Sequence, residues 1–272
     1  MANIQAVAKR AGVSISTVSR VLNGSAHVND DLKMRVDAAI QELEYRPSSA
    51  ARSLRANHST IIGLLISDIQ NPFFMGLIQG VEDVAQRNRY SLILCNSDEN
   101  AEMEQQYLEV LYDERIAGAI IVPTQEQLPN LNRFRERNIP LVAVDRRIKD
   151  NNIDAVLVDN VRGAREAVTH LIENGYRRIG VITGPQTVTT GQERLEGYRQ
   201  ALQEAGLPHD PLLERSGSFK GDNAQQLANE LLDLNPPIDA LFAGSNLLTI
   251  GALFALYARN RRVPDDIALV GY

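Results

Sequence analysis

The chain has 272 residues, a formal net charge of −6, and 44% hydrophobic and 23% charged residues. This length suggests about two domains, and the hydrophobic fraction excludes wholesale disorder. No stretch reaches the ~18 apolar residues of a membrane helix, and the N-terminal residues carry charges where a signal peptide needs an apolar stretch. A single cysteine, Cys95, excludes an internal disulfide, and the four scattered histidines have no cysteine pair with which to bind zinc. We therefore expect a soluble cytoplasmic protein without a metal or a cofactor.

The charge is unevenly distributed along the chain. The first 60 residues hold eight Lys and Arg against five Asp and Glu, a net charge of +3, so the other 212 residues carry −9. A small basic head on an acidic body favours a head that binds a polyanion such as nucleic acid. Chance variation of the surface would give the same asymmetry, so charge alone leaves both interpretations open.

The basic head has the pattern of a helix-turn-helix. Apolar residues recur at helical spacing from Ile4, and Gly12 then stands where a helix end favours a positive φ angle. Ser14 is a candidate N-cap for a second helix over residues 15–22, and a third helix is predicted to open at Asn29. The predicted inner faces of the second and third helices are formed by Val18, Val21, Leu22, Leu32, Val36, Ala39, Ile40 and Leu43.

The second helix turns short polar side chains outward. Ser16, Thr17, Ser19, Arg20 and Asn23 lie on this face. Short hydroxyl side chains can reach phosphates, and an Arg can bind a guanine edge through two hydrogen bonds. The face is therefore better suited to DNA than to the alternative, a plain three-helix bundle.

The head resembles the N-terminal part of the LacI/GalR family of transcription regulators. The resemblance is carried by IQAVAKRAGVSISTVSRVLNG (4–24) followed by LEYRPSSAARSL (43–54), an ordered set of matches spread over about the first 60 residues. It implies a DNA-binding domain over residues 1–46, in which Ile15, Ser16 and Arg20 face base edges in the major groove. It also implies that Ser14, Thr17 and Asn23 hold phosphates.

Residues 47–60 are predicted to be a hinge helix with its linker. Pro47 can open a helix, but a helix this short is only marginally stable in water. The segment is therefore a candidate for one that becomes helical only when it binds a partner. By resemblance, the hinge helix pairs with its twofold mate and inserts Leu54 into the minor groove at the centre of the operator. The alternative is an ordinary linker. The predicted DNA contacts of this segment are Ala51, Arg52, Leu54 and Arg55.

The remainder, residues 61–272, alternates apolar strand-like runs with helical segments. Strands are predicted at 61–67, 91–95, 118–122, 140–144, 154–158, 178–183, 239–243 and 267–271. Helical segments are predicted to fill most of the gaps, for example at 74–88, 102–114, 162–174, 193–206 and 246–260. Such alternation predicts parallel sheets with crossover helices, here in two similar α/β lobes of about 61–158 and 159–272. The strand ends of two such lobes meet in a cleft where ligands bind.

Common enzyme signatures are missing from this body. The sequence has no G-x-G-x-x-G, no G-x-x-x-x-G-K-[ST] and no G-x-S-x-G motif. Cys95 has no local support as a nucleophile and is interpreted as a thiol in a core strand. We therefore predict no catalytic residues and a protein that is not an enzyme.

The body also resembles the LacI/GalR family and, beyond it, the periplasmic sugar-binding proteins. The matching segments are DIQNPFF (68–74), VDRR (144–147), ERLEGY (193–198) and AGSNLLTIGAL (243–253). The resemblance implies a two-lobed fold like that of periplasmic binding proteins. It places Val188 and Thr190 in a loop, and it implies effector contacts at Asn71, Phe73, Phe74, Asp145, Arg146, Thr190, Arg194, Phe219 and Asn246.

These residues suit a sugar, because carboxylate, guanidinium and amide groups bind hydroxyls while aromatic rings stack on the apolar ring face. Each position also has a structural alternative. Asp145 and Arg146 could form a surface ion pair, Phe73 and Phe74 could be core residues, and Arg194 could pair with Glu193 or Glu196. Two residues disfavour a purine effector. Purine-responsive members usually carry Asp at the position of Asn246 and Arg at the position of Val188.

The sequence and its resemblance to the LacI/GalR family therefore predict a DNA-binding transcription regulator, a repressor that acts as a homodimer on a near-palindromic operator under the control of a sugar-like effector. A transport-type sugar-binding protein and a doubly wound enzyme are the alternatives. By resemblance we also expect the family fold to continue past Tyr272, so that this chain lacks the final part of both lobes and is poorly stable or inactive alone.

Overall fold

The computed structural model describes residues 3–22, 28–45 and 59–272, except for the side chains of residues 221 and 222. The chain divides into two units, residues 1–59 and residues 60–272. The predicted hinge lies almost entirely outside the described residues. Each unit is considered by itself.

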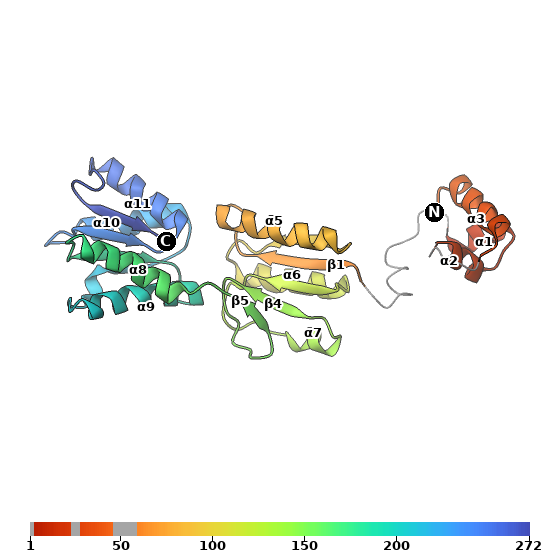
Figure 1. Ribbon diagram of the computed structural model, residues 1–272, viewed down its shortest axis with the longest axis horizontal. Helices are drawn as coiled ribbons and strands as arrows, with labels where there is room; N and C mark the ends of the chain where they lie inside the picture. The colour runs from red at the N-terminus through yellow and green to blue at the C-terminus, as the bar shows by residue number, and fades with distance from the viewer. Residues whose placement is uncertain (1–2, 23–27, 46–58) are drawn as a thin grey trace. The chain divides into compact units, whose positions relative to one another are not determined.

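The N-terminal unit contains α1 (Ile4–Ala11), α2 (Ile15–Leu22) and α3 (Asp30–Glu42), as Figure 1 shows. Asn3 caps α1 by accepting a hydrogen bond from the Ala6 N–H, and Gly12 ends it with a φ of 65°. The Ser14 hydroxyl accepts from the Thr17 N–H at the start of α2, and Asn29 caps α3. The predicted turn glycine and caps are thus confirmed.

A small apolar core holds these three helices together. Its buried members are Val7, Ala8, Ala11, Val18, Val36 and Ala39, with Val21, Leu22, Ile40 and Leu43 partly buried around them. The Arg35 guanidinium donates to the Ala11 and Gly12 carbonyls over 2.7 and 3.2 Å and so ties α3 to the turn between α1 and α2. This tie and the shared core fix the angle at which α2 presents its outer face.

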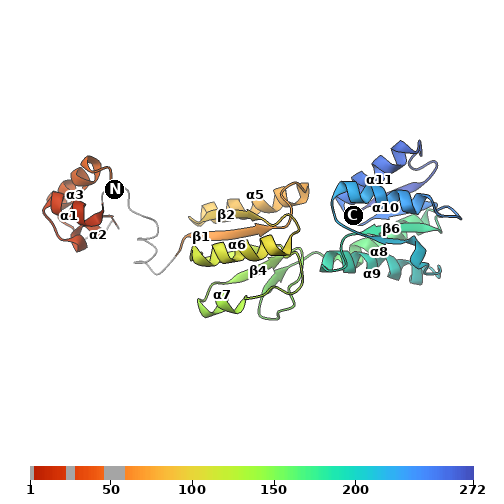
Figure 2. The ribbon, with the colours of Figure 1, turned by 180° about the vertical axis from the view of Figure 1, so that it is seen from behind.

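The second unit begins with a parallel sheet in the order β2-β1-β3-β4-β5. Its strands are β1 (Ile61–Ile66), β2 (Ser91–Asn96), β3 (Gly118–Ile121), β4 (Leu141–Val144) and β5 (Asp154–Val156). One face packs on α5 (Pro72–Arg87) through Leu64, Ile66 and Phe74. The other packs on α6 (Ala101–Asp113) and α7 (Asn132–Glu136), and the reverse view in Figure 2 shows α6 in front of this sheet. Cys95 is buried on this second face, as predicted.

A second parallel sheet follows in the order β7-β6-β8-β9. Its strands are β6 (Ile179–Thr183), β7 (Glu214–Ser216), β8 (Ala240–Ala243) and β9 (Ala268–Gly271). One face packs on α8 (Asn160–Glu173) and α9 (Thr189–Glu204), and the other on α10 (Gly221–Leu232) and α11 (Asn246–Ala258). A short 3-10 helix, η1 (Pro211–Leu213), precedes β7. In each sheet the first strand of the lobe lies between the next two strands in sequence, which is the arrangement that creates a binding crevice at the carboxyl ends.

The structure corrects the predicted elements in two places. Helix α9 begins at Thr189, four residues before the predicted start, so Thr190 lies in its first turn and not in a loop. The sequence lacks apolar periodicity there, and tertiary packing extends the helix. Strand β7 was not predicted because its three residues, Glu-Arg-Ser, are polar and lie at the sheet edge. Within the residues that the structure describes, none of the helices is long and apolar enough to span a membrane.

Candidate functional site

A cavity of about 380 Å³ opens where residues from the two sheets' carboxyl ends meet. All effector contacts predicted from the family resemblance line this one cavity: Asn71, Phe73, Phe74, Asp145, Arg146, Thr190, Arg194, Phe219 and Asn246. Three further lining residues, Val158, Ser245 and Tyr272, were not predicted. Each of the three follows a strand of its sheet, so the rule that ligands bind at strand ends could have found them.

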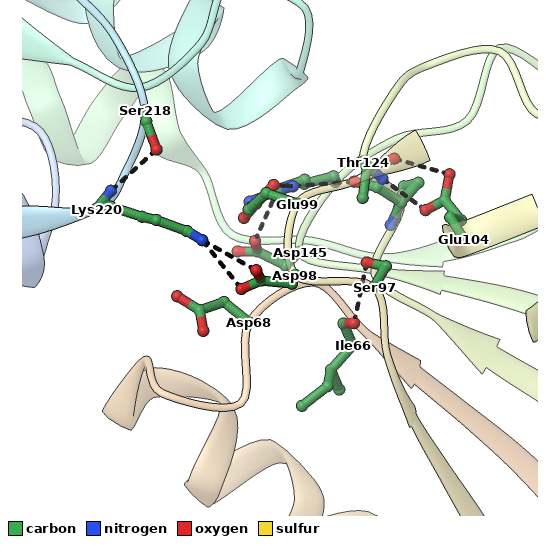
Figure 3. Close-up of polar contacts among 12 residues, drawn as sticks. Ile66, Asp68, Ser97, Asp98, Glu99, Glu104, Thr124, Asp145, Ser218 and Lys220 are labelled. Carbon is green, nitrogen blue, oxygen red and sulfur yellow. Dashed lines mark hydrogen bonds and ion pairs between the residues drawn. The ribbon is translucent and has the colours of Figure 1, made fainter. Parts of the chain in front are cut away.

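Arg146 is the most strongly held charged group of the cavity. Its side chain is 3% exposed and donates to both carboxylate oxygens of Glu99, over 2.6 and 2.8 Å. Nη1 also donates to the Pro123 carbonyl over 3.1 Å. Figure 3 shows Glu99 and Asp145 close together on the loops that end the first sheet. Arg146 is therefore part of a buried network, and the alternative of a surface pair with Asp145 is wrong.

Asp145 directly follows β4 and adopts a left-handed backbone conformation with a φ of 67°. Its carboxylate lies 3.7 Å from Arg146 Nε, beyond hydrogen-bonding distance. Burial raises the pKa of this carboxyl above its ordinary value, and the nearby guanidinium groups of Arg146 and Arg194 oppose that rise. The carboxylate is thus a buried acceptor whose negative charge is stabilised mainly by arginines.

Arg194 projects from α9 into the same cavity. Nε donates to the Asn160 side chain over 2.9 Å and Nη1 donates to the Gly244 carbonyl over 2.7 Å. The guanidinium lies 4.0 Å from the centroid of the Tyr272 ring, a cation–π arrangement. These partners replace the alternative pairing with Glu193 or Glu196, and burial lowers the pKa of the guanidinium while Asp145 opposes this.

Aromatic rings supply the apolar part of the cavity. Phe73 is about half exposed and meets Phe74 edge to face, with ring centroids 5.1 Å apart. Phe74 lines the cavity and also belongs to the core under α5, so its structural alternative, a core residue, is confirmed, whereas its effector contact stays a prediction. Phe219 packs directly against Gly184, where an added Cβ would overlap the ring. The absence of a side chain at Gly184 therefore allows the Phe219 ring to occupy its position in the cavity lining.

Polar groups of both lobes meet across the cavity. The Asn246 side-chain amide donates to the Asn71 side-chain oxygen over 3.0 Å, and the Arg147 N–H donates to the Thr189 hydroxyl over 3.0 Å. A further contact between the lobes joins Lys220 Nζ to the two Asp98 carboxylate oxygens, over 3.0 and 3.1 Å, as Figure 3 shows. These contacts join the lobes in the arrangement that encloses the cavity.

Two buried polar atoms of the cavity are unsatisfied. Among the described residues, Arg146 Nε and Thr190 Oγ1 have no hydrogen-bond partner. Both residues line the cavity and are almost fully buried. A buried polar atom without a partner is costly, so these two atoms favour a ligand that carries hydrogen-bonding groups.

The outer face of α2 is the candidate DNA-binding surface. Ser14, Ile15, Ser16 and Arg20 are exposed, and Thr17 is partly buried. The Ser14 hydroxyl lies 2.7 Å from the Ser16 hydroxyl and 2.9 Å from the Thr17 hydroxyl, so the three form one polar cluster at the helix start. The other predicted DNA contacts, Asn23, Ala51, Arg52, Leu54 and Arg55, lie outside the described residues.

Family comparison assigns both units of the chain. Residues 3–48 match the bacterial regulatory proteins of the lacI family, and residues 59–272 match the periplasmic binding proteins and sugar binding domain of the LacI family. The chain belongs to the LacI family. LacI-family membership makes it a DNA-binding regulator of transcription, and neither the transport-protein nor the enzyme alternative is favoured.

LacI-family relatives match along the whole chain. The ribose operon repressor of Halalkalibacterium halodurans is 42% identical over 272 residues, which are 100% of this chain and 80% of the relative. The repressor PurR of Actinobacillus pleuropneumoniae is 37% identical, over 100% of this chain and 81% of the relative. Among solved structures, a complex of the regulator CelR with cellobiose has a TM-score of 0.70 at 34% identity, over 100% of this chain and 83% of that one. The lac repressor dimer bound to operator has a TM-score of 0.81 at 25% identity, over 100% and 82%.

Proposed function

We propose that this protein is a cytoplasmic transcriptional repressor that binds operator DNA as a homodimer and changes its DNA affinity when a small neutral sugar occupies the cavity. The observation that carries the proposal is the composition of the cavity. Asp145, Arg194 and Asn246 supply a carboxylate, a guanidinium and an amide beside Phe73 and Phe219. This combination matches a ring with several hydroxyls on an apolar face.

The charge balance of the cavity supports a neutral ligand. Arg146 is paired with Glu99, and Arg194 faces Asp145, so two buried guanidinium groups are offset by two carboxylates. A sugar phosphate or sugar acid would bring an uncompensated negative charge into this site, which is unfavourable in a buried environment. We therefore expect free sugars to bind and their phosphates to be rejected.

The relatives suggest which sugar to test first. Two relatives, from Halalkalibacterium halodurans and Escherichia coli, are named ribose operon repressors. CelR, by contrast, forms a complex with the disaccharide cellobiose. D-ribose is therefore the first probe, with cellobiose as a larger neutral sugar for comparison.

The face of α2 supports the DNA-binding part of the proposal. Arg20 and Ser16 are exposed there, and Ile15 adds an exposed apolar side chain at the helix start. An Arg that binds guanine and an apolar group that contacts a thymine methyl are both means of reading the major groove. Ser14 and Thr17 are suited to phosphate contacts beside it.

Two exposed apolar surfaces support a homodimer. On α5, the more than half-exposed Val84 lines an apolar groove together with Leu77, Val81 and Tyr90. The surface of α11 includes the exposed Phe254 and Tyr257. Contiguous exposed apolar residues mark interaction surfaces more often than isolated ones do. A twofold dimer would cover the same surfaces on both copies and place two helix-turn-helix units on one operator.

Thermal melting against a sugar panel tests the effector assignment. The panel holds D-ribose, cellobiose, D-ribose 5-phosphate, gluconate and hypoxanthine. A ligand that binds only the native state adds RT ln(1 + [L]/Kd) to the stability, about 2.7 kcal/mol at 100 times Kd. We expect a neutral sugar to raise the melting temperature of the parent and to leave Asp145→Asn and Arg194→Met unshifted. A shift with the phosphate or with hypoxanthine instead of a free sugar would contradict the assignment.

A further inference from the structure

One buried acid lies just behind the cavity. Glu104 is in the first turn of α6 and is fully buried, whereas Glu102 and Glu109 on the same helix are exposed. It shares the buried side of the helix with Leu108 and Leu111, where an apolar residue would serve packing. Burying an ionisable group is costly unless it is hydrogen-bonded, so packing alone does not account for a glutamate here.

Both oxygens of Glu104 are used by a single residue. The Thr124 N–H donates to Oε2 over 2.7 Å, and the Thr124 hydroxyl donates to Oε1 over 2.9 Å. Thr124 lies in the loop that leaves β3, and Figure 3 shows the two hydrogen bonds from this loop to the glutamate on α6. The carboxyl group therefore holds the loop at one peptide unit, the unit between Pro123 and Thr124.

That peptide unit also contacts Arg146. Its N–H belongs to Thr124 and its carbonyl belongs to Pro123, and the Pro123 carbonyl accepts from Arg146 Nη1 over 3.1 Å. A peptide unit is planar, so fixing the direction of its N–H fixes the direction of its carbonyl. An acceptor on the N–H also polarises the unit and strengthens the carbonyl as an acceptor.

The position of Arg146 depends on few groups. Glu99 accepts from both terminal nitrogens, and the Pro123 carbonyl is the second acceptor for Nη1. With these nitrogens held, Nε remains next to the cavity without a hydrogen-bond partner among the described residues. A small rotation of the Pro123–Thr124 peptide unit would loosen the guanidinium plane and redirect Nε.

We propose that Glu104 is a positioning residue for sugar binding, which acts through the Pro123–Thr124 peptide unit to orient Arg146. The proposal rests on the proposed function, because it assigns a role in holding that same sugar. It concerns a residue that does not line the cavity. The effect of Glu104 on affinity therefore depends on Arg146 as the intermediary.

Three substitutions separate this role from simple packing. Glu104→Gln keeps an oxygen acceptor for the Thr124 N–H and a donor for its hydroxyl, whereas Glu104→Leu removes both hydrogen bonds at similar volume. Leu108→Val perturbs the same buried face of α6 one turn away and leaves the peptide unit untouched. By calorimetric titration with D-ribose, we expect Glu104→Leu to weaken binding about tenfold, or about 1.4 kcal/mol. Glu104→Gln should stay within about threefold of the parent, as should Leu108→Val.

A double-mutant cycle with Arg146→Lys tests the intermediary. Lysine keeps the positive charge but has no guanidinium plane to orient, so Glu104→Leu should cause less than about a twofold further loss in that background. An undiminished tenfold loss there, or parent-like binding by Glu104→Leu, would overturn the positioning role while leaving the proposed function intact. A folded parent that binds neither D-ribose nor cellobiose would overturn both.

Discussion

Glu104 shows how burial and hydrogen bonding act against each other at a single residue. Burial raises the pKa of its carboxyl group from 4.5 to about 7, and the hydrogen bonds from Thr124 and the charge of Arg146 oppose the rise. The negative charge of Glu99 adds to it. Near neutral pH the group is therefore close to its midpoint, although both of its hydrogen bonds can form in either protonation state.

This pKa predicts how stability depends on pH. The folded pKa is above the unfolded value, so the native state keeps a proton that the unfolded state releases, and stability falls as pH rises from 4.5 to about 7. Glu104→Gln cannot ionise and avoids this loss. Relative to the parent, its free energy of unfolding should rise as pH increases from about 4.5 to about 7, by up to about 3 kcal/mol. Urea titrations of both proteins across this range measure the difference, and a constant difference would contradict the prediction.

Gly184 sets the position of an aromatic ring in the cavity. A Cβ at this residue would overlap the Phe219 ring, so Gly184→Ala must displace this ring, which lines the cavity. We expect about a tenfold loss of sugar affinity and a lower melting temperature, because overpacking costs about 1–3 kcal/mol. Adding Phe219→Leu should restore the melting temperature but not the affinity. Calorimetry and thermal melting check both parts, and a double variant that melts no higher than Gly184→Ala would count against ring overlap as the cause.

The cavity residues differed in how well sequence could predict them. Asp145, Arg146, Arg194 and Asn246 lie in segments that resemble the family, and the structure brings them together. Glu99 and Glu104 were missed because they belong to a polar, acidic stretch, DENAEME, that is indistinguishable from a solvated helix start. The burial of Glu104 follows from the packing of α6 on the sheet, and the partial burial of Glu99 accompanies its pairing with Arg146, neither of which local sequence reveals.

At the scale of elements, a long-range contact from Arg35 supports the turn of the helix-turn-helix in addition to the shared apolar core. Arg35 on α3 donates to the last carbonyls of the α1 end, at Ala11 and Gly12. Carbonyls at a helix C-terminus have no partner within the helix and attract cations. The contact therefore stabilises the turn that sets the direction of α2.

Removing this contact should weaken DNA binding without affecting the cavity. For Arg35→Ala we expect the head to lose about 1 kcal/mol of stability and operator affinity to fall severalfold, with sugar affinity unchanged. Arg10→Ala is the matched control, because it also removes one positive charge from the head. The only ion pair that it breaks among the described residues is the exposed one with Glu42. Operator titrations by fluorescence anisotropy compare the two variants. Equal losses would mean that charge, not turn geometry, is responsible.

Strands were predicted better than helix boundaries. Continuous apolar runs such as IIGLLI mark buried parallel strands directly, and all the predicted runs form strands within a few residues. Thr189, Thr190 and Gly191 carry no apolar periodicity, yet they form the first turn of α9 because they are buried against neighbouring segments. Polar segments whose structure is decided by tertiary contacts were therefore the ones that sequence failed to place.

At the scale of the whole molecule, the proposed homodimer needs the apolar surfaces of α5 and α11 to be covered. Val84→Glu and Phe254→Glu place a charge on each of these exposed surfaces. Burying an unpaired carboxylate is strongly unfavourable, so each variant should dissociate into monomers at concentrations where the parent is dimeric. Val110→Glu is the control, since Val110 is about equally exposed but lies on α6. Sedimentation velocity separates the states, and unchanged dimers in the first two variants would exclude these surfaces.

Coupling between cavity and operator is the central claim, and one titration tests it directly. The operator is first identified from genomic DNA fragments that the protein retains. The affinity of the protein for this operator is then measured by fluorescence anisotropy, with and without D-ribose. We expect D-ribose to change the dissociation constant for the operator by about 5- to 150-fold, the change that typical coupling free energies produce. The change should be absent with D-ribose 5-phosphate and in Arg194→Met. Tight, sequence-specific DNA binding that no neutral sugar of the panel changes would contradict the claim.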